Sequence, residues 1–120
     1  MSPWECRVVR DYVPQYAAPI SVARGAQVVV HHEDIDFPGW WWCTASDGRS
    51  GWVPCELLEP PVQADARARV VDDYSATELA VMEGETVTIL EARRGWLSVR
   101  NERGARGWIP ASHVTRDARD

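Results

Sequence analysis

Short apolar runs separated by polar turn residues are the dominant pattern of this chain. Most runs are rich in Val, Ile or Trp and are bounded by Gly, Asp, Asn or Pro. No stretch has a helical period, apart from one 3-10 turn expected after Pro54 and another after Pro110. Runs of this length predict short antiparallel strands in a small barrel or sandwich, with hairpin turns at Ser46–Gly51 and Asn101–Gly107. The expected strands are RVV, QVVV, WWWCTA and WVP in the first half, and RVV, TVTIL, WLSVR and WIP in the second.

The two halves of the chain repeat each other. Gly39–Pro54 aligns with Gly95–Pro110 without a gap at an offset of 56, and both read G-W, ten residues, G-W-[V/I]-P. The offset is 59 for SVARGAQVVV against AVMEGETVTI, and 62 for RVVRDY against RVVDDY. Each step of three marks an insertion in the first copy, within residues 12–20 and within residues 32–40. Because insertions are tolerated on the surface, we expect loops at both places.

The period of the repeat sets the expected domain organisation. About 60 residues is close to the smallest size that folds alone, so each copy is expected to be one domain. We predict a first domain over residues 1–60, a linker over 61–66 and a second domain over 67–120. The adjacent Pro60 and Pro61 favour an extended, stiff linker. The expected fold class is all-β, with two consecutive five-stranded barrels.

The order of the motifs in each copy resembles that of a Src-homology-3 (SH3) domain. That family has an ALYDY strand, an RT loop, an ELSFxxGD turn, an n-Src loop, a W-W strand, a distal hairpin and a closing GxxPxxY. The first copy has VVRDYVP, PISVARGA, GWWWCTA and GWVPCELL, and the second has VVDDYSA, ELAVMEGE, GWLSVRN and GWIPASHV. Each motif alone is weak, but four in the same order, twice, cover almost the whole chain. The resemblance implies tandem SH3-like barrels.

The same resemblance implies that each copy binds a peptide in a groove, since the chemistry of the family is binding rather than catalysis. A polyproline helix loses little entropy on docking, and parallel aromatic ridges form slots for it. The corresponding groove positions hold Arg10, Tyr12, Trp40, Pro54 and Leu57 in the first copy, and Asp72, Tyr74, Trp96, Pro110 and His113 in the second. Two family tyrosines are replaced in each copy, which weakens the expectation of ordinary PxxP recognition.

The tryptophans of the W-W strands are the main candidates for exposed groove walls. The resemblance implies that Trp40 and Trp96 lie flat on the surface, one in each groove. Because side chains alternate along a strand, Trp40 and Trp42 share one face and Trp41 has the other. We expect Trp41 and Trp42 to serve mainly in packing. Two further groove aromatics are expected at Trp52 and Trp108.

Charges in the two n-Src loops differ in sign. The first loop places Glu33, Asp34 and Asp36 close to the groove, where they would receive a basic peptide residue. The second places Arg93 and Arg94 beside the groove, which favours an acidic partner. The alternative is that these are solvated loop charges, each pair worth less than about 1 kcal/mol.

Composition removes several classes of function. The net charge of −5 argues against a nucleic-acid partner, and no apolar run is long enough to cross a membrane. Three cysteines without CxxC spacing suggest neither a disulfide framework nor a metal site, and no cofactor is expected. All 13 basic residues are Arg, which we interpret as the coding bias of a GC-rich, bacterial genome. The N-terminus lacks a secretory pattern, so a cytoplasmic location is expected.

The favoured function is a non-catalytic protein-interaction module that binds peptide segments or a partner surface. Two alternatives stay open. One is an architectural pair of barrels, or a homodimer, in which the aromatic surfaces are packed shut. The other is a glycan- or cell-wall-binding module that uses Trp as a sugar platform. No nucleophile triad or paired carboxylates indicate an enzyme.

Overall fold

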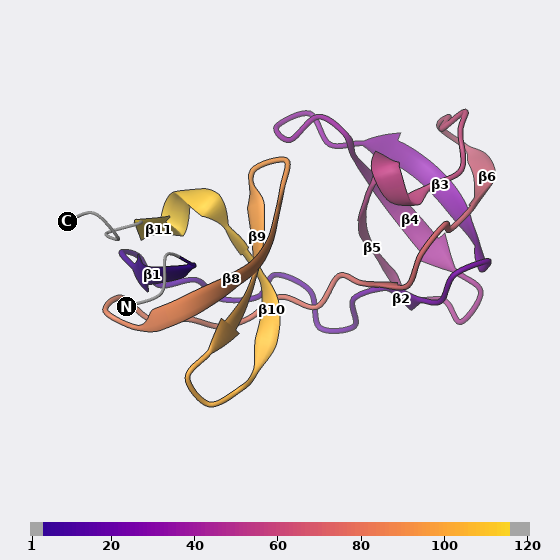
Figure 1. Ribbon diagram of the computed structural model, residues 1–120. Helices are drawn as coiled ribbons and strands as arrows, with labels where there is room; N and C mark the ends of the chain where they lie inside the picture. The colour runs from indigo at the N-terminus through magenta and orange to yellow at the C-terminus, as the bar shows by residue number, and fades with distance from the viewer. Residues whose placement is uncertain (1–3, 116–120) are drawn as a thin grey trace. The chain divides into compact units, whose positions relative to one another are not determined.

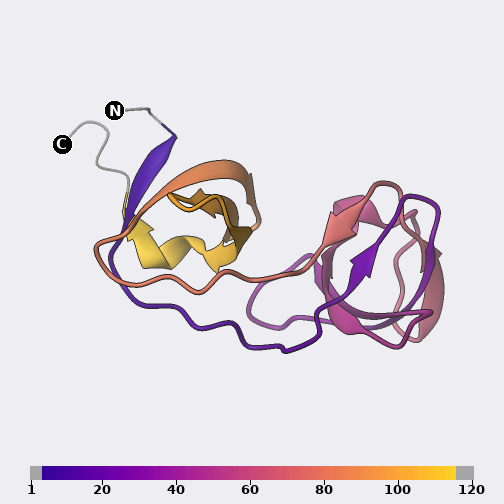
Figure 2. The ribbon, with the colours of Figure 1, turned by 90° about the horizontal axis from the view of Figure 1, so that it is seen from below.

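The computed structural model describes residues 4–115, and every regular element in that part is a strand or a short 3-10 helix. The all-β class expected from the sequence is therefore confirmed (Figure 1). The chain divides into two compact units: unit 1 comprises Met1–Gln15 and Glu78–Asp120, and unit 2 comprises Tyr16–Thr77. The chain therefore passes between the units twice, once in each direction (Figure 2).

Unit 1 is built on a five-stranded antiparallel sheet with the order β10-β9-β8-β1-β11. Its elements are β1 (Glu5–Val8), β8 (Thr86–Arg93), β9 (Trp96–Asn101), β10 (Arg106–Pro110), the 3-10 helix η2 (Ala111–His113) and β11 (Val114–Thr115). Figure 2 shows the indigo strand β1 beside the yellow β11, and Arg7 is the register partner of both Thr115 and Thr86. One core contains buried side chains from both sequence repeats, namely Cys6, Val8, Tyr12, Leu79, Val81, Val87, Ile89, Leu97, Val99 and Ile109.

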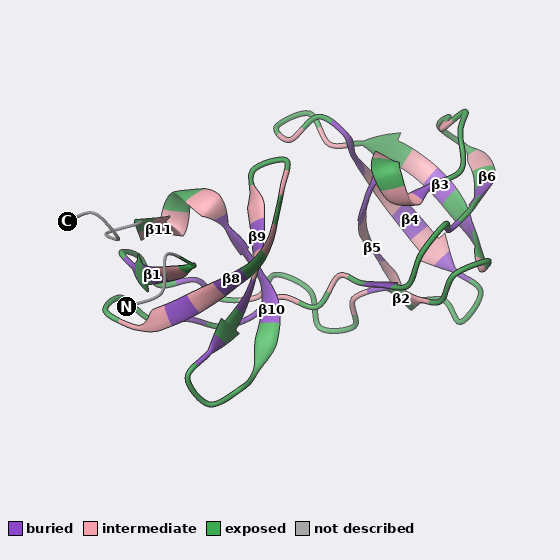
Figure 3. Cartoon of the chain, in the orientation of Figure 1, coloured by how far each residue is buried: buried purple, intermediate pink, exposed green. Residues whose placement is uncertain are grey.

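Unit 2 is built on a four-stranded sheet with the order β5-β4-β3-β6 and a two-stranded sheet of β2 and β7. Its elements are β2 (Ser21–Val22), β3 (Gln27–Glu33), β4 (Trp40–Ala45), β5 (Ser50–Pro54), the 3-10 helix η1 (Cys55–Leu57), β6 (Ala66–Arg69) and β7 (Tyr74–Ser75). Burial alternates along β3, so that Val28 and Val30 point inward while Gln27 and Val29 are exposed (Figure 3). Cys43 of β4 belongs to the same interior, and its burial raises the pKa of the thiol to about 12.

The compact units do not coincide with the sequence repeats, because the repeats exchange their first strands. Strand β1 of the first repeat pairs with β8 and β11 of the second. Strand β6 of the second repeat pairs with β3 of the first. The division expected from the sequence, at 1–60, 61–66 and 67–120, thus differs from the division of the structure. Residues 61–66, expected to link two domains, lie inside unit 2 between η1 and β6.

The exchanged strands occupy equivalent places in the two sheets. Arg7 lies opposite Thr86 in unit 1, and its repeat counterpart Arg69 lies opposite Gln27 in unit 2. Strands β3 and β8 also carry their register irregularities at equivalent positions, after Val30 and after Ile89. The backbone pairing offered to either first strand is therefore the same, and pairing alone does not decide which sheet each strand joins.

The short connection after η1 gives a physical reason for the exchange. The backbone N–H of Glu59 donates to the carbonyl of Arg69 at 2.8 Å, and the N–H of Val71 donates to the carbonyl of Leu57 at 2.9 Å. Segments that are close in sequence and run antiparallel pair as neighbours at little cost in loop closure. The last segment of the first repeat therefore pairs with the first strand of the second.

Because of the exchange, unit 2 is one continuous stretch of chain. Its counterpart of β1 is β6, which follows β3, β4 and β5 in the sequence instead of preceding them. Unit 2 is inserted into the RT loop of unit 1, the loop that follows Tyr12. On the unit 1 side the loop is held together, because the N–H of Gln15 donates to Oε1 of Glu78 at 2.8 Å. On the unit 2 side the N–H of Ala76 donates to the carbonyl of Ile20 at 2.9 Å.

The glycine of each G-W-[V/I]-P motif permits a close approach of two chain segments. A Cβ at Gly107 would lie 2.7 Å from the backbone carbon of Glu78 and 2.7 Å from the backbone nitrogen of Leu79. A Cβ at Gly51 would meet the side-chain methyl Cγ2 of Ile20 at 2.8 Å, whereas the nearest backbone atom, the nitrogen of Ile20, would lie 3.1 Å away. We therefore expect Gly107→Ala to destabilise unit 1 by about 2–3 kcal/mol through overpacking, and Gly51→Ala to destabilise unit 2 by less.

Calorimetric unfolding of the two variants beside the unaltered chain measures this difference. Gly107→Ala should lower the melting temperature of one unit by at least about 8 °C. An unchanged melting temperature for Gly107→Ala, or a larger loss for Gly51→Ala, would contradict the packing of β10 against the Glu78–Leu79 backbone.

Candidate functional sites

Strand register places the candidate aromatic residues of each unit on one face of a hairpin. In unit 1, Trp96 lies opposite Pro110 and Trp108 lies opposite Ser98. In unit 2, Trp40 lies opposite Pro54, Trp41 opposite Val53 and Trp42 opposite Trp52. Because side chains alternate along a strand, Trp40, Trp42 and Trp52 share a face, while Trp41 lies on the face of the buried Val53.

In unit 1 an aromatic corner forms from residues of both repeats. Tyr12, which follows β1, meets Trp96 edge to face with ring centroids 6.0 Å apart, and meets His113 in the same manner at 5.4 Å. The Tyr12 hydroxyl donates to Oε1 of Glu78 at 3.0 Å. We call Tyr12, Trp96, Pro110 and His113 the unit 1 corner. Tyr12 and Pro110 are buried, whereas Trp96 and His113 are half-buried and reach solvent.

Backbone hydrogen bonds hold the three segments of the unit 1 corner together. The N–H of Ala111 donates to the carbonyl of Gly95 at 2.9 Å, which joins η2 to the loop before Trp96. The N–H of Val9 donates to the carbonyl of His113 at 2.8 Å, which joins the end of β1 to η2. The corner is therefore fixed by backbone geometry and exists only where the two repeats meet.

Several basic groups adjoin the unit 1 corner. The pKa of His113 is lowered from its ordinary value, first by desolvation and then by the positive charge of Arg10. Arg93 is the last residue of β8 and lies opposite Trp96, and its Nε donates to Oε2 of Glu91 at 2.7 Å. Arg94, in the turn between β8 and β9, has a left-handed backbone with φ of 46°. Arg10 and Arg94 are exposed, so one cationic residue follows β1 and another directly precedes Gly95 and Trp96.

Unit 2 carries a separate cluster of four rings, which we call the unit 2 patch: Tyr16, His32, Trp42 and Trp52. The ring centroids of Trp42 and Trp52 are 5.1 Å apart, that of Tyr16 is 5.2 Å from Trp42, and that of His32 is 5.7 Å from Trp52. The indole Nε1 of Trp52 donates to the Tyr16 hydroxyl at 3.3 Å. Tyr74 supports the patch from β7, since its hydroxyl donates to the carbonyl of Trp52 at 2.8 Å.

The acidic loop of unit 2 is organised by its own carboxylates. Oε2 of Glu33 accepts the N–H of Gly39 at 2.8 Å, and Oδ1 of Asp34 accepts the N–H of Asp36 at 2.8 Å. Glu33 and Asp36 remain exposed. The loop follows directly after His32 of the unit 2 patch, so a negative charge adjoins the four rings.

The sites differ from the sequence expectation in which residues they combine. Tyr12 was expected beside Trp40, but it contacts Trp96 and His113 instead. Tyr74 was expected with Trp96, but it belongs to unit 2 and bonds to Trp52. Both differences follow from the strand exchange, since each tyrosine comes soon after the first strand of its repeat and lies in the unit that this strand joins.

Burial also revises the role expected for Trp40. Its side chain is 4% exposed, so it is a packed residue rather than an open groove wall. Pro54 is fully buried and Trp108 is 8% exposed, while Leu57 is half-buried. Trp96, Trp52 and Trp42 are half-buried and retain accessible surface, so these indoles can meet a ligand.

Sequence reasoning missed three members of the unit 2 patch and the contact to Glu78. Trp42 was assigned to packing, although its alternation with Trp40 already placed it on the groove face. Tyr16 lies in the insertion of the first copy, so the repeat offered no counterpart to compare with it. Glu78 and Tyr12 are 66 positions apart, and only the strand exchange brings them together.

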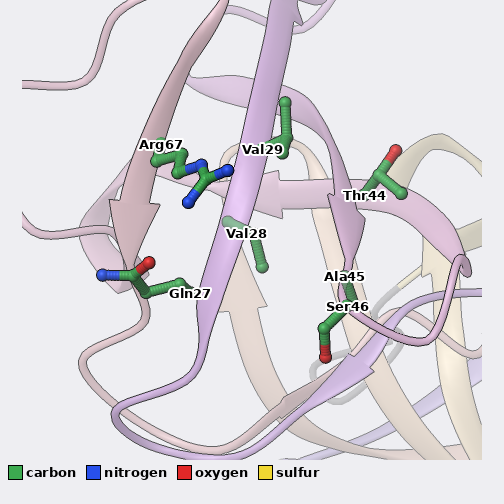
Figure 4. Close-up of a pocket in the computed structure, with 7 residues that line it drawn as sticks. All are labelled: Gln27, Val28, Val29, Thr44, Ala45, Ser46 and Arg67. Carbon is green, nitrogen blue, oxygen red and sulfur yellow. The ribbon is translucent and has the colours of Figure 1, made fainter.

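Other surfaces offer less chemistry. A shallow hollow of about 260 Å³ on β3, β4 and β6 contains none of the expected site residues (Figure 4). It is lined by Gln27, Val28, Val29, Thr44, Ala45, Ser46 and Arg67.

Among residues 4–115, no three His, Cys, Asp or Glu side chains are grouped as metal ligands. The described part of the chain also contains no helix long and apolar enough to cross a membrane.

Comparison with known proteins bears on both units. Residues 6–60 and residues 67–116 each match the family described as the variant SH3 domain. One similar protein is Intersectin-2 of Mus musculus, which is 25% identical over 135 residues. The match covers 89% of this chain and 8% of the length of Intersectin-2. No solved structure matches the chain.

Proposed function

Because the chain belongs to the variant SH3 domain family, whose members are protein-interaction modules, we propose that it binds two extended peptide segments without catalysis. The unit 1 corner is one site and the unit 2 patch is the other. The observation that carries the proposal is the edge-to-face packing of Tyr12 against Trp96 and His113 beside Pro110. Rigid rings with one accessible edge offer slots to an extended chain, which loses little entropy on docking.

The unit 2 patch supports a second peptide site, which favours a ligand of positive charge. Trp42 and Trp52 offer accessible ring surface beside the carboxylates of Glu33 and Asp36. A guanidinium or ammonium group of a peptide would meet ring faces and negative charge together. A segment with Arg or Lys next to apolar residues is the ligand class that this surface favours.

The main alternative is a homodimer that covers these rings. Trp40 is already packed within the chain, which leaves a modest apolar surface to cover. Stable dimers bury about 800 Å² on each partner, so a dimer would need surface well beyond the four rings of the patch. A bacterial source, a cytoplasmic location and the absence of nucleic-acid or membrane partners remain parts of the proposal.

Nitrogen-15 spectra of the tryptophan side chains test the two-site proposal. Trp96 and Trp52 would each be assigned by substitution with Phe, and peptides of differing charge would be added. We expect saturable shifts of one or both indoles, with Trp40 unchanged because it is packed. If no peptide moves either indole, while sedimentation shows a dimer that protects them, the rings serve assembly instead of peptide binding.

A further inference from the structure

The two units differ in net charge. Counted over the sequence, unit 2 has nine acidic residues against four Arg, whereas unit 1 has nine of each. The whole net charge of −5 therefore belongs to unit 2. Without exchange, Arg10 would join the acidic loop at residues 33–36, and Asp72 would join Arg93 and Arg94. With exchange, Arg10 lies in the same unit as Arg93 and Arg94, and Asp72 lies in the same unit as the acidic loop.

Three carboxylates near the unit 1 corner are hydrogen-bonded or ion-paired within the unit. Oε1 of Glu78 accepts both the Tyr12 hydroxyl and the N–H of Gln15. Glu91 is paired with Arg93, and Oδ1 of Asp11 accepts the N–H of Glu83 at 2.7 Å. Within the described residues, no carboxylate forms an ion pair with Arg10. Arg10 follows Val9, whose N–H donates to the carbonyl of His113 at 2.8 Å, and this backbone contact places Arg10 beside the corner.

We propose that the unit 1 corner selects an extended acidic peptide. Apolar residues or prolines of the peptide lie against Tyr12 and Trp96. Its carboxylates reach Arg10 on one side and Arg94, in the turn before Trp96, on the other. The proposal rests on the proposed function, because it names the ligand class of the same site. The residue that makes the difference is Arg10, which the exchange delivers from the other repeat.

Charge complementarity favours this ligand over the usual basic, proline-rich one. Exposed cationic groups beside an aromatic surface attract a chain with spaced carboxylates and repel one with arginines. Such rim charges act mainly on encounter and are screened by salt. Binding of the acidic peptide should therefore weaken as ionic strength rises.

Three synthetic twelve-residue peptides of alternating Glu-Pro, Gln-Pro and Arg-Pro test the inference on the full chain. Affinity is read from the Trp96 indole shift, with the Trp52 indole reporting on unit 2. We expect the Glu-Pro peptide to bind most tightly at Trp96, and the Arg-Pro peptide to move Trp52 alone. Arg10→Asp copies the residue that the second repeat has at the equivalent place, and it should weaken Glu-Pro binding about tenfold.

Matched variants separate the outcomes. Asp72→Arg makes the opposite swap in unit 2 and should leave Glu-Pro binding at Trp96 unchanged. Arg10→Gln removes the charge without reversing it and should have an intermediate effect, while an unaltered set of other indole signals confirms folding.

If Gln-Pro binds as tightly as Glu-Pro and Arg10→Asp has no effect, the peptide site stands but its acidic preference is wrong. If none of the three peptides moves Trp96, the peptide site of unit 1 is itself refuted. Equal or tighter binding of a single-stranded oligo-uridine would assign the basic corner to nucleic acid and overturn the peptide ligand.

Discussion

Cysteines introduced at Arg7 and Thr86 should form a disulfide in nearly all molecules under mild oxidation. These residues are register partners in unit 1, and Gln27 and Arg69 are the equivalent partners in unit 2. Partners in antiparallel strands have Cα atoms about 4.5–5.5 Å apart, within the range that a disulfide spans. A second variant with cysteines at Gln27 and Arg69 should therefore close equally well. Mass spectrometry of peptides after proteolysis identifies each bridge.

The crossed pairs supply the control for strand exchange. If each repeat kept its own first strand, Arg7 would lie opposite Gln27 and Arg69 opposite Thr86. Cysteine pairs at those positions should remain reduced in the exchanged chain. Efficient closure of the crossed pairs, together with failure of the direct pairs, would show that the repeats fold consecutively. All four chains carry Cys55→Ser, since Cys55 is half-buried, whereas Cys6 and Cys43 are buried.

A fragment of residues 16–77 should fold cooperatively without the rest of the chain. All of its strand pairs lie inside the fragment: β2 with β7, β3 with β4 and β6, and β4 with β5. It also contains its own buried interior, including Ile20, Val30, Val53 and Val70. Sixty-two residues are enough for a marginal single domain. Thermal unfolding followed by circular dichroism should show one sigmoidal transition.

The complementary chain tests unit 1 in the same way. Residues 16–77 would be replaced by a short Gly-Asn turn between Gln15 and Glu78, whose hydrogen bond at 2.8 Å shows that the two ends already meet. This chain should fold and keep the Tyr12 contact to Trp96. Fragment 16–65, which lacks β6 and β7, is the matched negative control and should stay unfolded. If 16–77 is as unfolded as 16–65, unit 2 depends on the rest of the chain.

Sequence reasoning reached the class of the fold because the two copies agree at every motif. The constant 56-residue offset between the G-W motifs placed strands β4, β5, β9 and β10 and the hairpins between them. The strand exchange was out of reach for the same reason. RVVRDY and RVVDDY suit either sheet equally, because they present the same alternation to equivalent partners. The deciding factor is the short connection after Leu58, which joins neighbouring strands more readily than distant ones.

The candidate sites were likewise predicted only in part, and the errors come from the exchanged segments and from burial. Register alone placed Trp96 beside Pro110 and Trp52 on the groove face. The partners of these residues come from the exchanged segments, so Tyr12 and Tyr74 were attached to the wrong grooves. Burial of Trp40 depends on how its surroundings pack, which alternation along β4 does not determine.

Nested connectivity also decides how the chain would carry mechanical tension. Strands β1 and β11 are antiparallel neighbours, with Arg7 opposite Thr115 and Val8 opposite Val114. Tension applied through the two ends therefore pulls both strands from the same side and opens their hydrogen bonds one after another, as a zipper opens. Tension reaches unit 2 only after unit 1 has yielded, because unit 2 is held between Gln15 and Glu78. In a series of proteins joined end to end and placed under tension, unit 1 would unfold first and unit 2 would stay folded until unit 1 had opened.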